Sequence, residues 1–299
     1  MLYGAIEAGG TKFVCAVGND HQKVIQKITF PTSTPEETFR QVFEFFDAFS
    51  LKAIGVGSFG PIDVNSDSPT YGYIKNTPKT AWQNIDFLGP IKNRYEIPVG
   101  WTTDVNAAAL GEATKGAGKG LANVLYLTIG TGIGGGAIIN GEILEGFGHP
   151  EMGHIKVEIH PNDQFEGLCP FHDHCLEGMA SGPTIEARLS KKGYEIDEDN
   201  NVWGLLSDYI AQALYHYTVV LCPQIIILGG GVMKNPSLLP KIKNDLLEKL
   251  GDYVKPPSIE NYLAKPGLGD DAGVVGGLIL AEKTYKGIDS NERRYRFLL

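Results

Sequence analysis

The sequence has no excess of positive charge and no long apolar run. Lys and Arg total 26 against 35 Asp and Glu, so the formal net charge is −9; this argues against the broad basic surface that contacts a nucleic acid backbone. No apolar stretch approaches the roughly 18 residues of a membrane helix. Met1 leads into LYGAIEAGG without the basic and apolar regions of a signal peptide. We therefore expect a cytoplasmic protein that binds neither nucleic acid nor membrane.

Cysteine is also scarce, with four in 299 residues. A reducing cytoplasm disfavours disulfides, and Cys15 and Cys222 lie in apolar runs, where we interpret them as core thiols. The other two, Cys169 and Cys175, flank two histidines in GLCPFHDHCLEG, residues 167–178. This cluster is open to four interpretations: an active site, a disulfide, a structural metal site, or an accidental grouping in a loop.

Glycine, in contrast, is abundant, and it is concentrated between apolar runs. The 38 glycines gather in segments such as GAIEAGGTK, TIGTGIGGG and LGGGV, as expected where a turn brings backbone close to another group. Each half of the chain opens with strand, Gly/Thr turn and strand, which predicts a duplicated α/β architecture. The predicted strands, several of them ending in Gly-rich turns or loops, lie within 2–10, 12–18, 24–30, 52–63, 97–104, 123–132 and 223–231. The predicted helices include 35–50, 105–117, 213–222 and 270–286.

The sequence fully matches neither of two common phosphate-binding motifs, the P-loop and the dinucleotide-binding fingerprint. In EAGGTK, Thr11 precedes Lys12, the reverse of a P-loop. GTGIGG matches the spacing of a dinucleotide fingerprint, but AIINGEIL after it predicts a hairpin with an Asn-Gly turn where a helix is required. Two Gly/Thr-rich β-turns remain, one in each half. They are either phosphate-binding turns with open backbone N–H groups or ordinary tight hairpins.

The ordered motifs EAGGTK, TTDVNAAALGE, LTIGTGIGGG, HPEMGHI, CLEGMASGP and ILGGGV resemble the ROK family of sugar kinases and repressors, over essentially the whole chain. The segments GAIEAGGTKF and CPFHDHCLE are most similar to the bacterial fructokinase branch of this family. The resemblance implies two ribonuclease H-like domains of the actin-like ATPase and sugar kinase fold, with an interdomain cleft. We place the smaller domain at 1–116 plus the tail at about 284–299, and the larger, Cys/His-bearing domain at 117–283. Segments 71–84 and 145–183 are expected to be loop-rich insertions.

Asp104 ends a predicted strand and begins a predicted helix, so it is either a helix N-cap or a general base at a cleft. The resemblance implies the base, although the preceding family Asn is Thr103 here. Glu7 stands where many relatives have Asp, near the phosphates and Mg²⁺, and Lys12 is either a phosphate contact or a surface lysine. The nucleotide-binding residues implied by the resemblance are Gly9, Gly10, Thr11, Lys12, Thr131, Gly132, Gly182, Pro183, Gly229, Gly230, Gly231, Val232 and Met233.

The same resemblance assigns sugar and metal contacts. The sugar residues it implies are Gly60, Asn76, Thr103, Glu151, His154 and Glu177; taken singly, each is also consistent with an ordinary polar loop. Cys169, His172 and Cys175 have the spacing of tetrahedral zinc ligands. The resemblance favours His172 over His174, and His154 over His149 as the fourth ligand. A closed set of four protein ligands predicts a structural zinc.

These observations together predict an ATP-dependent fructokinase that uses Mg²⁺ with ATP, with Asp104 as general base. Alternatives are a kinase for glucose, mannose or an N-acetylhexosamine, and a sugar-responsive regulator, which would carry a DNA-binding segment before the first strand. A zinc-ribbon module would leave most of the chain unexplained. The resemblance also implies a homodimer, and the tail NERRYRFLL, residues 291–299, is expected to be a helix end or a subunit contact.

Overall fold

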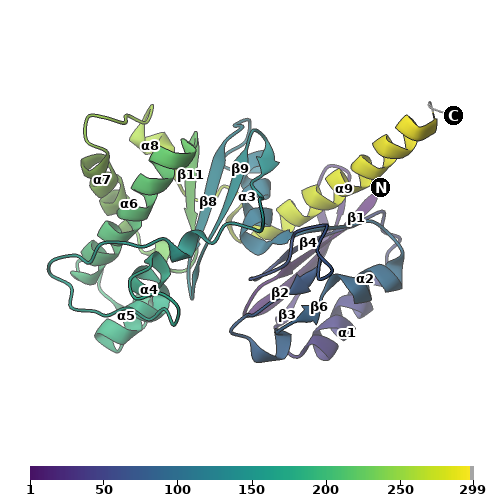
Figure 1. The fold of residues 1–299 in the computed structure, drawn as a ribbon, viewed down its shortest axis with the longest axis horizontal. Coiled ribbons are helices and arrows are strands. Elements are labelled where there is room, and N and C mark those ends of the chain that lie inside the picture. The colour runs from purple at the N-terminus through teal and green to yellow at the C-terminus, as the bar shows by residue number, and fades with distance from the viewer. Residues whose placement is uncertain (297–299) are drawn as a thin grey trace. The chain divides into compact units, whose positions relative to one another are not determined.

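The computed structural model describes residues 1–296, and the side chains of residues 1–287. The chain forms two compact units (Figure 1). Unit 1 comprises Met1–Gly116, Ile143–His149 and the chain from Asp270 onward, and unit 2 comprises Ala117–Glu142 and Pro150–Gly269. The last three residues of the predicted tail lie outside the described residues.

Unit 1 is built on a five-stranded mixed sheet. The strands are β1 (Leu2–Ala8), β2 (Lys12–Asn19), β3 (Val24–Pro31), β4 (Ile54–Ser58) and β7 (Val99–Thr103), in the spatial order β3-β2-β1-β4-β7. The first three form an antiparallel meander, and β4 and β7 continue the sheet parallel to β1. A small hairpin adds β5 (Tyr73–Ile74) and β6 (Ile85–Asp86). The Gly9–Gly10 turn therefore lies at the same sheet edge as the carboxyl ends of β4 and β7.

Both faces of this sheet are covered, which explains its continuous apolar strands. Helices α1 (Pro35–Phe46) and α2 (Leu88–Tyr95) pack on one face, against Ile6, Phe13 and Val56. Helix α9 (Ala272–Arg296) packs on the other, where Val274 and Leu278 belong to one core cluster with Ala5. The period of two along β1 and β2 divides their side chains between these two cores.

Helix α3 (Asp104–Lys115) lies directly against α9. Small residues permit this approach, because a Cβ on Gly111 would collide with the carbonyl oxygen of Ala272, and one on Gly276 with that of Ala107. Close packing here fixes the first turn of α3, and with it Asp104, relative to the sheet.

Unit 2 repeats the arrangement. Its strands are β8 (Val124–Ile129), β9 (Ile133–Ile139), β10 (Glu142–Ile143), β11 (Ile225–Gly229) and β12 (Leu263–Ala264), in the order β10-β9-β8-β11-β12. β8 pairs antiparallel with β9 and parallel with β11, as β1 pairs with β2 and β4. The helices are α4 (Leu176–Ala180), α5 (Gly182–Leu189), α6 (Val202–Leu221), α7 (Leu238–Leu250) and α8 (Ile259–Tyr262). The duplicated architecture is confirmed.

The structure corrects some local predictions and agrees with others. The predicted helix 213–222 is the second half of α6, and Cys222, interpreted as a core thiol, is exposed at its C-cap with φ 46°. Segment 71–84 is held firmly: Trp82 is 1% exposed, stacks on Phe13 and donates from Nε1 to Ser33 O at 2.8 Å. The predicted Asn140–Gly141 turn is confirmed, with φ of 53° and 80°. Within residues 1–296, no helix has the length and apolarity to cross a bilayer.

Candidate active site and metal centre

In unit 1, Asp104 is the first residue of α3 and follows β7 directly. Thr103 is the N-cap, because its Oγ1 accepts a hydrogen bond from Asn106 N at 3.1 Å. The cap interpretation of Asp104 is therefore wrong. Thr103 is only 4% exposed and uses its hydroxyl in the cap. Asp104 Oδ1 accepts from Val105 N at 2.9 Å, which holds the carboxylate at the helix N-terminus.

Glu7 lies beside Asp104, at the end of β1. Burial, reinforced by the negative charge of Asp104, raises the pKa of Glu7 to about 7, although Lys12 acts in the opposite direction. Glu7 Oε2 is buried and has no hydrogen-bond partner. Gly273 at the start of α9 packs on the carboxyl group, since a Cβ there would lie 2.6 Å from Glu7 Cδ. The unpartnered oxygen leaves Glu7 with an acceptor that could receive a hydrogen bond from the hydration shell of a cation.

The Gly9–Gly10 turn joins β1 to β2 next to this pair. Gly9 N donates to Lys12 O at 3.0 Å, and Thr32 Oγ1 donates to Gly9 O at 2.7 Å. A Cβ on Gly9 would lie 2.8 Å from Lys12 O, so the tight turn requires glycine there. Thr11 and Lys12 are exposed. The turn presents short side chains and backbone to solvent, as a phosphate-binding turn requires.

The two predicted sugar loops of unit 1 lie side by side. Lys75 N donates to Pro61 O at 2.8 Å, and Ile62 bridges to Ile74, which places Gly60 and Asn76 on adjacent segments. Asn76 is exposed. His149 belongs to the same region, because its Nε2 accepts a hydrogen bond from Ile62 N at 3.1 Å.

In unit 2, a cavity of about 720 Å³ opens where three glycine-bearing turns meet. Gly182 N donates to Gly130 O at 2.7 Å, so the start of α5 is joined to the β8–β9 turn. Gly230 adopts φ 93° and packs on the Ile129 backbone. The predicted nucleotide residues that line the cavity are Thr131, Gly182, Pro183, Gly231 and Val232. Gly132, Gly229, Gly230 and Met233 are not among its lining residues.

Sequence reasoning missed the rest of the cavity wall. Ile185, Ile196 and Trp203 give it an apolar side, and Lys234 and Asn235 give it a polar one. Asn235 Oδ1 accepts from Ser237 N and Oγ at 2.8 Å each. A volume of this size, with apolar walls and few polar groups, is typical of a small-ligand site. Only the position of Asn235 directly after LGGGVMK could have indicated it.

The remaining sugar candidates also belong to unit 2. Glu177 lies under the β8–β9 turn, where its Oε2 accepts from Ile133 N at 2.8 Å. Partial burial raises the pKa of Glu151, His154 acts to lower it, and the charge of Glu177 raises it further. The two carboxylates therefore lie near one another. Glu151 precedes the 3₁₀ turn Met152–His154, which carries His154.

His154, Cys169, His172 and Cys175 form one cluster, with a ligand atom from each within 4.8 Å of every other. His154 Nδ1 lies 3.8 Å from Cys169 Sγ and 3.6 Å from Cys175 Sγ, and Cys169 Sγ lies 3.5 Å from His172 Nδ1. Zinc bond lengths with tetrahedral angles require S···N edges of about 3.6 Å. The donor set fits a tetrahedral metal ion. His174 and His149 are outside it.

Comparison with known proteins identifies the family of the chain. The model of the ROK family matches residues 3–284. A fructokinase of Lactococcus lactis subsp. cremoris is 48% identical, over 94% of this chain and 97% of its own, and a glucokinase of Thermotoga maritima is 28% identical over 94% and 98%. The crystal structure of a ROK hexokinase from Thermus thermophilus superposes with a TM-score of 0.81 at 25% identity, covering 96% and 100% of the two chains. The chain is a member of the ROK family and has its sugar kinase fold.

Proposed function

We propose that this protein transfers the γ-phosphoryl group of ATP to the 6-hydroxyl of fructose. The observation that carries the choice of fructose is the 48% identity, over nearly the full length of both chains, with a protein named fructokinase. The relative named glucokinase is only 28% identical.

In the proposed reaction Asp104 is the general base. Its carboxylate accepts the proton of the 6-hydroxyl as O6 attacks the γ-phosphorus, the bond from phosphorus to the β–γ bridging oxygen breaks, and fructose 6-phosphate and ADP are released. Thr103, and not Asp104, is the N-cap of α3, so the helix does not need the Asp104 side chain as its cap; this supports the proposed role. For the hexose hydroxyls we propose contacts from Gly60, Asn76, Thr103, Glu151, His154 and Glu177.

For the nucleotide, we propose that the cavity of unit 2 holds the base and ribose. The Gly9–Lys12 turn and Thr131–Gly132 hold the phosphates, and Gly182, Pro183 and 229–233 complete the nucleotide contacts. Mg²⁺ bound with ATP would offset the phosphate charge, and Glu7 would hold it through its hydration shell. The unpartnered Glu7 Oε2 fits that task.

We propose zinc at the Cys/His cluster. Four protein ligands leave no position open for water, so the ion would be structural, holding the loop that bears Cys169 and His172 against Glu151 and Glu177. We further propose that the protein is a cytoplasmic homodimer, and that its domains divide near Gly116, with the C-terminal tail joining the first.

The test is ADP release by the purified zinc-loaded protein with Mg-ATP and fructose, glucose, mannose or N-acetylglucosamine. A preference for fructose that is lost in Asp104→Asn supports the proposal. Turnover of another hexose in place of fructose would overturn the choice of fructose as substrate. Turnover of none of the four would overturn the proposed kinase activity.

A further inference from the structure

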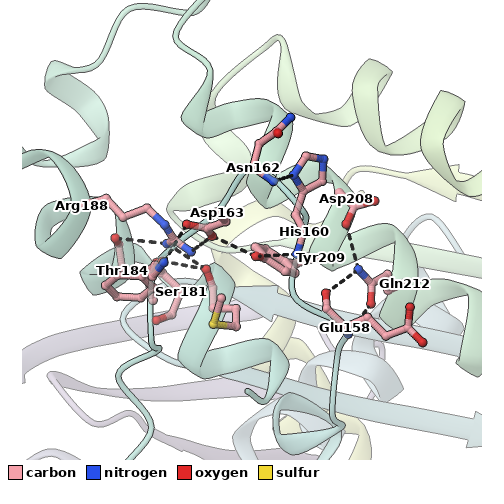
Figure 2. Close-up of polar contacts among 12 residues, drawn as sticks. Glu158, His160, Asn162, Asp163, Ser181, Thr184, Arg188, Asp208, Tyr209 and Gln212 are labelled. Atoms are coloured by element: carbon pink, nitrogen blue, oxygen red, sulfur yellow. Dashed lines mark hydrogen bonds and ion pairs between the residues drawn. The ribbon is translucent and has the colours of Figure 1, made fainter. Parts of the chain in front are cut away.

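A buried ion pair lies within unit 2, away from the metal ligands. Arg188 of α5 donates from Nη2 to Asp163 Oδ2 at 2.7 Å, and the two side chains are 8% and 6% exposed. Tyr209 of α6, which is fully buried, donates from its hydroxyl to the same oxygen at 2.8 Å. Figure 2 shows these three side chains converging from α5, α6 and the loop that carries Asp163. We call them the clamp.

The clamp closes on the corner of the loop between His154 and Cys175. Asp163 Oδ1 accepts from Phe165 N at 3.1 Å, which turns the chain from the first arm of the loop, residues 155–162, toward Cys169. Tyr209 Oη accepts from His160 N at 3.2 Å, and the Arg188 guanidinium lies 4.0 Å from the centre of the Phe165 ring. Every residue of the clamp thus holds this corner by two contacts or more.

Arg188 also reaches the helix that carries Glu177. Its Nη1 donates to Met179 O at 3.0 Å and to Thr184 O at 3.3 Å. Met179 belongs to α4, whose second residue is Glu177, and Thr184 belongs to α5, whose first residues line the nucleotide cavity. One guanidinium therefore joins the metal-bearing loop, α4 and α5.

Such a pair is costly as a source of stability alone. Removing two charges from water offsets most of their mutual attraction, and well-packed apolar residues often serve equally well. Here Arg188 Nε is buried with no hydrogen-bond partner, which adds to the cost. Although burial opposes it, hydrogen bonds from Arg188, Tyr209 and Phe165 N hold the pKa of Asp163 below its usual range, so the pair is charged.

The second arm of the loop, residues 166–174, is attached by backbone hydrogen bonds near each of its ends. Leu168 N donates to Gly178 O at 3.0 Å, and Val157 N donates to His174 O at 3.0 Å where the loop closes. The first arm is fixed independently by α6, because Gln212 and the Glu158 backbone exchange hydrogen bonds of 2.7 and 3.0 Å. At Asp163 the chain turns from the arm that α6 holds into the arm that carries Cys169 and His172. The orientation of the second arm therefore depends on how firmly this corner is held.

We propose that Arg188, Asp163 and Tyr209 are positioning residues that pre-form the metal-bearing loop without the metal, and so determine how tightly zinc is held and how well the sugar side of unit 2 is ordered. The exchange consequence rests on this geometry alone, whereas the consequences for zinc and for the sugar rest on the proposed zinc site and the proposed function.

The test compares Asp163→Asn, which keeps shape and removes charge, and the milder Tyr209→Phe with Leu246→Ala. Leu246 is fully buried in α7 and lies apart from the loop in sequence and element, so its variant controls for lost stability. Three quantities are measured on the full chain: transfer of zinc to a chromogenic chelator, KM for fructose and for Mg-ATP, and hydrogen exchange of segment 166–175 in metal-free protein.

For Asp163→Asn we expect zinc transfer to accelerate about tenfold, the low end of the effect of residues that orient metal ligands, with a smaller acceleration in Tyr209→Phe. KM for fructose should rise, and KM for Mg-ATP should stay within about twofold, because Arg188 Nη1 still joins α5 to Met179 O of α4. Exchange in 166–175 should quicken in both clamp variants and remain at the parent rate in Leu246→Ala.

A purely structural role predicts another pattern. If Asp163→Asn lowers the melting temperature but matches Leu246→Ala in zinc transfer and in exchange of 166–175, the proposal is overturned. If the unaltered protein fails to phosphorylate fructose, the proposed function fails, yet the exchange comparison still decides on the clamp.

Discussion

The Glu7 carboxyl allows a quantitative prediction. Its pKa rises from 4.5 to about 7 in the folded protein, chiefly by burial and then by the charge of Asp104. Each pKa unit corresponds to 1.36 kcal/mol, so ionised Glu7 reduces the free energy of unfolding by about 3 kcal/mol above pH 7. Glu7→Gln removes the ionisation and should recover a large part of that amount at pH 8.

The direction in which stability changes with pH follows from the number of protons that the folded and unfolded states bind. Between pH 4.5 and about 7 the folded state keeps a proton on Glu7 that the unfolded state has lost, so stability due to this group falls as pH rises through that window. Below pH 4.5 both states are protonated, and there Glu7→Gln should differ little from the parent protein. The advantage of the variant should therefore grow from pH 5 to pH 8.

The assay is urea unfolding at pH 5 and pH 8 without nucleotide or divalent metal, followed by tryptophan fluorescence. Trp82 and Trp101 are buried in unit 1 with Glu7, while Trp203 belongs to unit 2, so a Trp203→Phe background restricts the signal to unit 1. If Glu7→Gln and its parent lose stability equally between pH 5 and pH 8, the carboxyl does not titrate in this range and the reasoning is wrong.

Four further outcomes are expected. Asp104→Asn should lower kcat by about 10²–10⁴-fold, the usual contribution of a general base, with the melting temperature nearly unchanged because Thr103 caps α3; steady-state kinetics and a thermal scan check this. Cys169→Ser should lose bound zinc and raise the fructose KM, as measured by metal analysis and kinetics, whereas Cys222→Ser at an exposed C-cap should do neither. Trp82→Ala should destabilise unit 1 by about 3–5 kcal/mol in urea unfolding, as expected for truncating a buried aromatic. Zinc removal by a chelator at neutral pH should be slow and should accelerate as pH falls, because protonation competes with binding; a chromogenic chelator follows this.

Neighbouring residues were sufficient to predict the elements that short-range interactions determine. The strand–turn–strand openings, the Asn140–Gly141 hairpin and the start of α1 at Pro35 were all predicted from neighbouring residues. The cap of α3 could not be assigned, because Thr103 and Asp104 are both good caps and only the backbone decides between them. The duplicated sheet followed from the repeated pattern of apolar runs and Gly/Thr turns.

The features that could not be predicted from the sequence depend on residues that are distant in the chain. The walls of the cavity, such as Ile185 and Trp203, are apolar and look like ordinary core positions in sequence. Arg188 and Asp163 are 25 residues apart, with no periodic relation to indicate that they pair. The Cys/His cluster could be predicted because three of its ligands are close in sequence, and the fourth, His154, needed the family resemblance.

The discontinuity of unit 1 has a consequence for synthesis of the chain. Its sheet comes from the first 116 residues, but one face is covered by Val274, Leu278 and Ala281 of α9. Domains usually fold as they leave the ribosome, the N-terminal one first. Here the sheet of unit 1 needs a helix that is translated only after unit 2, and we expect unit 2 to acquire protease resistance on stalled ribosomes before unit 1 does. A chaperone that shields exposed strands would bind the strands of unit 1 until α9 has been synthesised.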